Sequence, residues 1–375
     1  MLALFWTSVT LIIYTYLGYP LILMALSRFR SRTVEAEKDY FPPVTLIVTV
    51  FNEEQRLKKK IANTLELDYP RDRLEIVFAS DASTDTTDDI IRSYGDKGIK
   101  LVRTSHRGGK ENAQKCAIEQ AQGDIMVFSD VATMLDKNGI KSIVANFADQ
   151  GVGCVSSEDR FINPDGAISG EGAYVKYEMW LRSLESRVNS VVGMSGSFFA
   201  ARKEVCRNWP TNIPSDFNTL LNSIRSGFRG ISDPLSLGIY SNIKDEKKEF
   251  DRKVRTITRG ISALFADTSL MNPAAYGLFS WQLISHKLLR WCVPWFLAAA
   301  FAANLFLISS GKLKYVFSFI MQLSFYALAL QKNLHKNRSL IKIPHYFVQV
   351  NWAIAVAWVK FLKGERFVTW TPSKR

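Results

Sequence analysis

Acidic and amide side chains follow three of the apolar stretches in the first third of the chain. Asn52 and Glu53 follow the first stretch, Asp81 follows the second, and Asp130 ends the run "GDIMVFSD". The carboxyl ends of parallel strands meet at one edge of a sheet, where open α/β sheets bind nucleotides and other ligands. One such acid could equally be a helix cap or a turn residue. Three on strand ends of one sheet predict a shared binding crevice.

Basic residues in two later segments are suited to binding phosphate. Lys110 follows two glycines at the expected start of a helix, and a helix amino terminus attracts anions; its alternative is a plain surface lysine. Arg252 and Arg255 lie in "EFDRKVRTITRG", and arginine can bind a diphosphate through two parallel hydrogen bonds. The alternative for this segment is a basic helix on anionic lipid.

Several other site types are excluded or disfavoured. No GxGxxG follows the first apolar stretch and no GxxxxGK[ST] occurs, which argues against a dinucleotide fingerprint and an ATPase-type phosphate loop. The four cysteines form no CxxC pair and the four histidines are dispersed, so a zinc site is not expected. Scattered cysteines of this kind fit reduced packing residues in a cytosolic domain.

The elements that must position these side chains alternate between strand-like and helix-like patterns. Strands are expected at 44–51, 74–80, 99–104 and 125–129, with helices at 52–67, 83–95 and 110–123. Such alternation predicts an α/β fold, with a parallel sheet and helices on both faces.

Composition favours a well-filled core or a membrane partner. The chain has 375 residues, is 47% hydrophobic and carries a formal charge of +13. This charge suits an anionic partner. Nucleic acid is discounted, because the basic residues lie mainly beside apolar segments and lack interleaved aromatics. An anionic membrane lipid and a phosphate-bearing substrate stay as the expected partners.

The ends of the chain predict membrane segments. No charged residue occurs from Leu2 to Leu26, a run long enough to cross a bilayer, and arginines follow at 28, 30 and 32. By the positive-inside rule, this is an uncleaved anchor that holds the next domain in the cytoplasm. Trp291–Ser309 and Tyr315–Leu330 predict a membrane hairpin. Tyr346–Leu362 could span or lie in the interface; three spans would leave the basic tail inside, and four would leave it outside.

The motifs, in their order, resemble a known family. "VTVFNEE", "ASDASTDTT", "RGGKENAQKCAI", "FSDVAT", "GMSGSFFAARKEV", "SDF" and "RKVRTITRG" are similar to segments of membrane-bound family 2 glycosyltransferases. These are inverting, nucleotide-sugar-dependent enzymes whose relatives include hyaluronan, chitin and cellulose synthases. The resemblance covers about Val44 to Ala263. It implies a GT-A-like, Rossmann-type fold with a mainly parallel sheet, plus N-terminal and C-terminal transmembrane helices. The expected parts are an anchor at 1–27, a cytoplasmic GT-A domain at 40–243, basic interfacial helices at 244–287 and a transmembrane or interfacial region at 288–375.

The resemblance also implies roles for the polar residues. Asp130 is the expected ligand of Mg²⁺ or Mn²⁺, although Ala132 stands where relatives carry a second acid; magnesium can use one carboxylate together with substrate phosphates. The residues expected to bind the donor are Asn52, Glu53, Asp81, Lys110, Arg252 and Arg255.

Asp216 is the expected catalytic base, with Ser215 in place of the usual preceding acid. From local sequence alone, Asp216 could equally be a helix N-cap. Gly196 and Ser197 are expected on the acceptor side. Relatives that make long polymers carry Gln-x-x-Arg-Trp, and only its arginine is matched here, by Arg255, which argues against a long homopolymer.

The sequence therefore predicts a membrane-anchored inverting glycosyltransferase of the inner membrane. It would move a sugar from a nucleotide donor, a UDP-sugar, to a lipid-linked or growing polysaccharide acceptor, as in exopolysaccharide biosynthesis. The alternative is a scaffold that kept the fold, binds nucleotide and lost catalysis. Donor sugar, acceptor, linkage and oligomeric state stay open.

Overall fold

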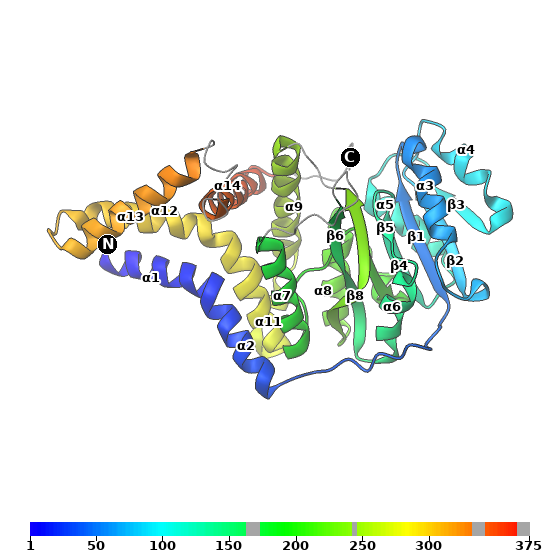
Figure 1. Cartoon of the computed structure of the whole chain (residues 1–375), viewed down its shortest axis with the longest axis horizontal. Coiled ribbons are helices and arrows are strands. Elements are labelled where there is room, and N and C mark those ends of the chain that lie inside the picture. Colours follow the sequence, from blue (N-terminus) through cyan, green and yellow to red (C-terminus); the bar gives the residue numbers. More distant parts are fainter. Residues whose placement is uncertain (163–172, 242–245, 332–341, 366–375) are drawn as a thin grey trace.

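A computed structural model describes residues 1–162, 173–241, 246–331 and 342–365. An α/β part built around one sheet lies at one end of the molecule, and a group of long helices lies at the other (Figure 1). Helices α7 (Ala173–Val188) and α9 (Glu246–Ala266) stand between the two parts.

The sheet has eight strands in the order β3-β2-β1-β4-β7-β6-β8-β5. Neighbouring strands β3, β2, β1 and β4 are parallel, as the alternating pattern predicts, whereas β7 runs antiparallel to both β4 and β6. The predicted α/β fold is confirmed, and its sheet is mixed. The strands are β1 (Val44–Val50), β2 (Leu74–Ser80), β3 (Ile99–Arg103), β4 (Ile125–Asp130), β5 (Met134–Leu135), β6 (Val152–Ile162), β7 (Phe198–Arg202) and β8 (Arg229–Ser241).

Helices cover both faces of the sheet because both faces of its strands are apolar. On β1, Leu46 and Val48 pack on one face and Ile47 on the other, with all three fully buried. The first face meets α3 (Glu54–Leu65), α4 (Thr87–Arg92) and α6 (Gly139–Ala145); the second meets α5 (Lys110–Gln120) and α8 (Ser215–Arg225). Strands buried on both faces read as continuous hydrophobic runs, which is how the sequence predicts them.

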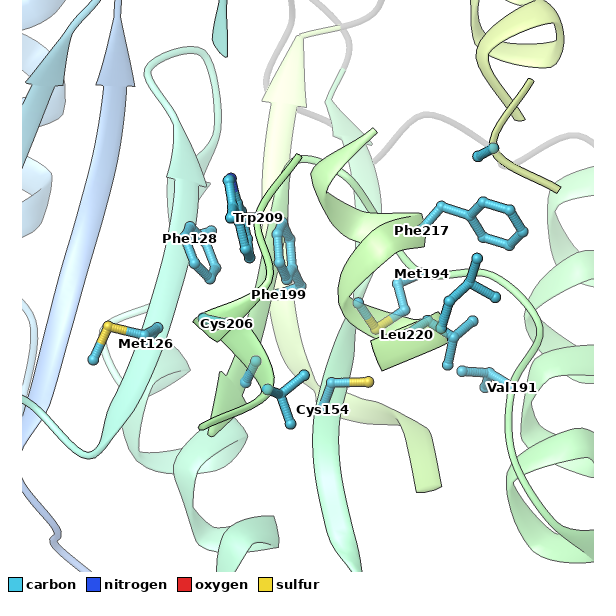
Figure 2. Close-up of a cluster of buried hydrophobic side chains, with 14 of the residues drawn as sticks. Met126, Phe128, Cys154, Val191, Met194, Phe199, Cys206, Trp209, Phe217 and Leu220 are labelled. Atoms are coloured by element: carbon cyan, nitrogen blue, oxygen red, sulfur yellow. The ribbon is translucent and has the colours of Figure 1, made fainter. Parts of the chain in front are cut away.

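An aromatic stack locks the centre of the second face. Phe128 of β4 stacks on Phe199 of β7 and on Trp209, with ring centroids 4.7 and 5.0 Å apart (Figure 2). Phe217 of α8 and Met194 belong to the same cluster. The stack therefore fixes the end of β4, the loop before β7 and the start of α8 relative to one another.

Three helical stretches are long and apolar enough to cross a membrane among the described residues. They are Leu2–Phe29, Leu278–Ile308 and Leu313–Leu330. The first comprises α1 (Leu2–Ile13) and α2 (Tyr19–Phe29) joined by a π-helical turn, and the second comprises α11 (Leu278–Leu283) and α12 (Leu289–Ile308) joined in the same way. The third is α13 (Leu313–Leu330).

The fourth apolar run forms α14 (Lys342–Leu362), which packs beside α9. Its Trp358 indole donates to the carbonyl of Trp291 at 2.8 Å, and Thr258 of α9 donates to the carbonyl of Ala357 at 3.5 Å. One face of α9 is thus committed to α14. The tail at 366–375 lies outside the described residues.

A buried charged group joins the anchor helix to the rest. Glu185 accepts a hydrogen bond from Tyr19 at 2.7 Å and contacts Nδ1 of His286 at 2.6 Å. Nε2 of His286 lies 3.3 Å from Glu178, which also pairs with Arg290. Burial alone would raise the pKa of Glu178, but Arg290 and His286 hold it well below its usual range. Removing one partner would leave a buried charge uncompensated, so the group ties α2, α7 and the 278–308 stretch together.

Candidate active site

A cleft of about 300 Å³ opens at the carboxyl ends of β1 and β4. Residues 194–197 of the loop before β7, the start of α8 and one face of α9 line its other sides. Its lining is strongly charged: the basic side chains are Arg56, Lys110, Arg182, Arg252, Arg255 and Arg259, and the acidic ones are Glu53, Glu111, Asp130, Asp159 and Asp216. The sequence-predicted residues that line it are Glu53, Lys110, Asp130, Gly196, Ser197, Asp216, Arg252 and Arg255.

Lys110 is the central cation of the cleft. It is the first residue of α5, and its ammonium donates to Oδ1 of Asp130 at 2.6 Å and to the carbonyl of Gly196 at 2.8 Å. Burial would lower the pKa of Lys110, but Asp130, with Glu111 and Asp216, outweighs it and raises it. Lys110 is therefore a fixed positive charge between the end of β4 and the loop before β7.

Asp216 lies in the first turn of α8, close to that same loop. A Cβ built on Gly196 would lie 3.4 Å from the Asp216 carboxylate, so the glycine leaves room directly beside it. The N-cap of α8 is Pro214 and no side chain caps the helix, so the alternative in which Asp216 is the N-cap is not observed. Within the described part of the chain, the carboxylate makes no hydrogen bond or ion pair. A half-buried carboxylate without a partner, facing a cleft, is placed to take a proton.

Asn52 and Glu53 behave differently from one another. The Glu53 carboxylate lines the cleft and is bound by both Nε and Nη2 of Arg56 at 2.8 Å; burial raises its pKa, and Arg56 opposes the rise. Asn52 is exposed, lies outside the lining and adopts φ of +51°. Its side chain exchanges hydrogen bonds with Thr84, at 2.8 Å to the Thr84 amide. Asn52 thus ties the end of β1 to the loop after β2.

Asp81 is buried behind the lining. Its carboxylate accepts from the amide of Gly108 at 2.8 Å and from that of Gly109 at 2.9 Å. These are the two glycines before Lys110, and Gly109 has a φ of +95°, which strains other residues. Asp81 therefore holds the loop that aims Lys110 into the cleft.

Three arginines of α9 face the cleft at helical spacing. Arg252 pairs with Glu249 at 2.8 Å, and Arg259 pairs with Glu111 at 2.7 Å. Arg255 has no hydrogen bond or ion pair among the residues that the structure describes. Burial lowers its pKa, and the positive charges of Arg259 and Arg252 lower it further. An anion bound here would relieve both effects.

Two further residues that shape the cleft are not predicted from the sequence. Asp159 accepts hydrogen bonds from Ser195 at 2.6 Å and from Ser197 at 2.8 Å, and so fixes the loop before β7. Arg182 of α7 lines the cleft from the side of the long helices. Neither belongs to a recognisable motif. The one feature of the sequence that could have identified them is a charged residue inside a segment with no other unusual composition.

Lys60 was also missed. It is fully buried on α3, and its Nζ donates to Ser129 at 2.8 Å and to the carbonyl of Thr133 at 2.5 Å. Burial lowers its pKa to about 7, against the opposing attraction of Asp130. The amine therefore holds the turn that follows β4 in place.

The acidic residues fit a divalent cation held by one carboxylate. No group of three or more His, Cys, Asp or Glu side chains within the described ranges could hold a metal. Asp130 keeps Oδ2 without a described partner while Oδ1 meets Lys110, and Ala132 supplies no second acid. Magnesium binds in this manner when substrate phosphates and water complete its shell.

Comparisons with known proteins agree with this geometry. Residues 45–209 match the family model described as Glycosyl transferase family 2. A beta-monoglucosyldiacylglycerol synthase of Synechocystis is 31% identical over 135 residues, which is 35% of this chain and 28% of the relative. A poly-beta-1,6-N-acetyl-D-glucosamine synthase of Staphylococcus epidermidis is 23% identical over 192 residues, or 49% of this chain and 46% of the relative. The chain thus spans less than half the length of these relatives.

A solved structure is similar over nearly the whole chain. The mannosyltransferase PcManGT from Pyrobaculum calidifontis, in complex with GDP-Man and Mn²⁺, has a TM-score of 0.76 and 23% identity, and the match covers 96% of this chain and 99% of that one. At this identity the likeness concerns the fold. The predicted family resemblance is confirmed over residues 45–209, which match the glycosyl transferase family 2 model, and the fold is GT-A-like.

Proposed function

We propose that the protein is a membrane-anchored inverting glycosyltransferase that moves a sugar from a nucleotide donor, a UDP-sugar, to a lipid-linked or growing polysaccharide acceptor. One observation carries the proposal. The unpartnered carboxylate of Asp216 and the cationic pair of Lys110 and Arg255 line the same cleft. An inverting transfer needs one base and a separate set of charges that stabilise the leaving group.

The donor diphosphate fits the cationic part of the cleft. Lys110, Arg252 and Arg255 would bind its oxygens, and Asp81 and Asn52 would support the nucleoside end through the loops they hold. Asp130 would hold the divalent cation, which supplies positive charge against the leaving diphosphate. This arrangement makes a separate general acid unnecessary.

The transfer forms one bond and breaks one, and Asp216 of the cleft accepts the proton that is released. The acceptor hydroxyl oxygen forms a bond to the anomeric carbon while Asp216 takes the hydroxyl proton. The bond between that carbon and the donor phosphate oxygen breaks, and its electron pair leaves with the nucleoside diphosphate. Attack from the side opposite the leaving group inverts the anomeric centre.

The membrane setting supports a lipid-linked or growing glycan as acceptor. Three helices could cross a bilayer, and the names of the two relatives above refer to a glycosylated lipid and to a polysaccharide. The arginines at 28, 30 and 32 favour a cytoplasmic α/β part at the inner membrane.

One observation favours the alternative of a nucleotide-binding scaffold. The ion pair between Lys110 and Asp130 occupies one oxygen of the carboxylate that would hold the cation, and Ala132 offers no replacement. A protein in which this pair never opens would bind nucleotide without turnover.

Nucleotide release by the purified full-length protein tests the proposal. A panel of UDP-sugars and GDP-sugars would be incubated with membrane lipid extract and with Mg²⁺, Mn²⁺ or chelator. The wild type should release nucleotide from one donor. Asp216→Asn should lower release by about 10²- to 10⁴-fold while UDP still binds, because only the base is lost. The matched control Asp96→Asn, an exposed acid far along the sheet edge, should retain full release.

Two results would count against the proposal. Undiminished release by Asp216→Asn would remove Asp216 as the base. Nucleotide binding with no release from any donor would make the scaffold the better reading.

A further inference from the structure

Two basic side chains on the membrane side of the cleft are unused by the proposed reaction. Arg182 of α7 lines the cleft, and Lys287 lies in the 278–308 stretch. The Lys287 ammonium fills the space above Gly193, since a Cβ built on that glycine would lie 2.6 Å from Nζ. Among the described residues, neither side chain has a hydrogen bond or an ion pair to its charged group.

The neighbouring acids offset these two cations only in part, because other cations share them. Glu178 and Glu185 lie on the same helix as Arg182, but their carboxylates are engaged by Arg290 and His286. Arg182 and Lys287 are close enough to repel one another. Two half-buried like charges whose nearest acids already pair with Arg290 and His286 favour the binding of an anion beside them.

The position of this pair relative to the base limits the size of the ligand. Gly193 contacts Lys287, and Gly196 contacts Asp216, three residues further along the same loop. Three residues of extended chain span at most about 11 Å. An anion at Lys287 and a hydroxyl at Asp216 would therefore belong to one short headgroup, about one sugar in length.

The position of Lys287 also indicates that the anion is attached to a lipid. Lys287 belongs to a stretch apolar enough to cross a membrane, and α7 lies beside α11 between the α/β part and the long helices (Figure 1). A ligand that reaches the cleft past Lys287 comes from the lipid side. Basic pockets between membrane helices are suited to lipid phosphate.

We propose that Arg182 and Lys287 bind the phosphate of a lipid-linked acceptor, in which phosphate joins the lipid to the sugar that receives the new residue. This rests on the proposed function and narrows its acceptor class. The phosphate ester stays intact: the bond forms at the sugar hydroxyl, Asp216 receives the proton, and no bond to phosphorus of the acceptor breaks.

Binding of three probes to the full-length protein in detergent micelles tests this. Farnesyl phosphate carries lipid and phosphate, farnesol carries lipid alone, and inorganic phosphate carries the anion alone. Farnesyl phosphate should bind and both others should bind much more weakly. Equal binding of farnesol would overturn the phosphate site, and equal binding of inorganic phosphate would overturn its assignment to a lipid.

Variants locate the site. Arg182→Gln and Lys287→Gln should each weaken farnesyl phosphate binding by about tenfold to a hundredfold, as expected for a lost charge-assisted hydrogen bond. Gly193→Ala should also weaken it, because the added methyl displaces the ammonium without removing its charge. The matched control Arg187→Gln, an exposed arginine on the same helix, should bind as the wild type does.

UDP binding separates the two ways in which the experiment can fail. Variants that still bind UDP are folded, so unchanged farnesyl phosphate binding in them overturns the acceptor site alone. A wild type that binds farnesyl phosphate but neither binds nor turns over any nucleotide sugar would overturn the proposed function instead.

Discussion

The buried amine of Lys60 should make the stability of the protein depend on pH in a predictable direction. Its pKa of about 7 lies about 3.5 below the ordinary lysine value of 10.5. At about 1.4 kcal/mol per pH unit, the charged amine destabilises the fold by about 5 kcal/mol at pH 6. Between pH 7 and 10.5 the unfolded chain holds a proton that the folded protein has released, so stability rises with pH. Between pH 6 and 9 the rise is about 3 kcal/mol.

Lys60→Met removes this titration while keeping the shape of an unbranched side chain. The substitution also removes the hydrogen bonds to Ser129 and Thr133. That loss should change stability by nearly the same amount at every pH, because a neutral amine donates both bonds as a charged one does. As the pH rises, the wild type should therefore become more stable relative to Lys60→Met. Lys59→Met, an exposed neighbour on the same helix, should show no such dependence.

Thermal unfolding in one detergent at several pH values, followed by circular dichroism, measures this difference. For a domain of this size, about 3 kcal/mol corresponds to a change of roughly 5 to 10 °C in the gap between the two midpoints from pH 6 to pH 9. Parallel curves for wild type and Lys60→Met would refute the reasoning. They would mean that Lys60 stays charged throughout, with Asp130 as its counter-ion.

Two further substitutions probe the donor side of the cleft. Asp81→Asn should raise KM for the donor about tenfold or more and lower the thermal midpoint, because a charged acceptor of two backbone N–H groups is lost. If KM changed for only one nucleotide and the thermal midpoint did not change, Asp81 would instead contact the base directly. Ala132→Asp should lower the Mg²⁺ concentration needed for half-maximal release, since it adds a second carboxylate beside Asp130, and an unchanged metal titration would argue against a cation at that turn.

The strands and helices of the first 130 residues were predictable because each carries a simple apolar pattern. Strand β2 begins and ends where "LEIVFAS" does, and β1 and β4 end within one residue of their predicted limits. Strands β6 and β8 were not predicted. Two irregularities in their register and several polar residues interrupt the alternation that identifies a strand.

The residues of the candidate site could be predicted from their types and positions, but their hydrogen-bond partners could not. Asp81 was expected to contact the donor, which stays a prediction, and the structure shows that its carboxylate also accepts hydrogen bonds from the amides of Gly108 and Gly109. That role depends on a contact across 27 residues, which no local pattern reveals. Arg182 was missed for a similar reason: it lies on a helix of mixed composition, and only the three-dimensional packing turns it toward the cleft. The donor-binding and catalytic roles stay predictions.

The buried link between the anchor and the later helices has a consequence for synthesis of the chain. Tyr14 hydrogen-bonds to Ser285, 271 residues later, and Tyr19 reaches Glu185 and, through it, His286. At about 5 to 20 residues per second, the ribosome needs roughly 15 to 55 s to make the residues in between. During that interval the first helix is in place without its partners, while the α/β part can already fold. The α/β part therefore has time to fold before the helices from residue 278 onward can pack against the first helix.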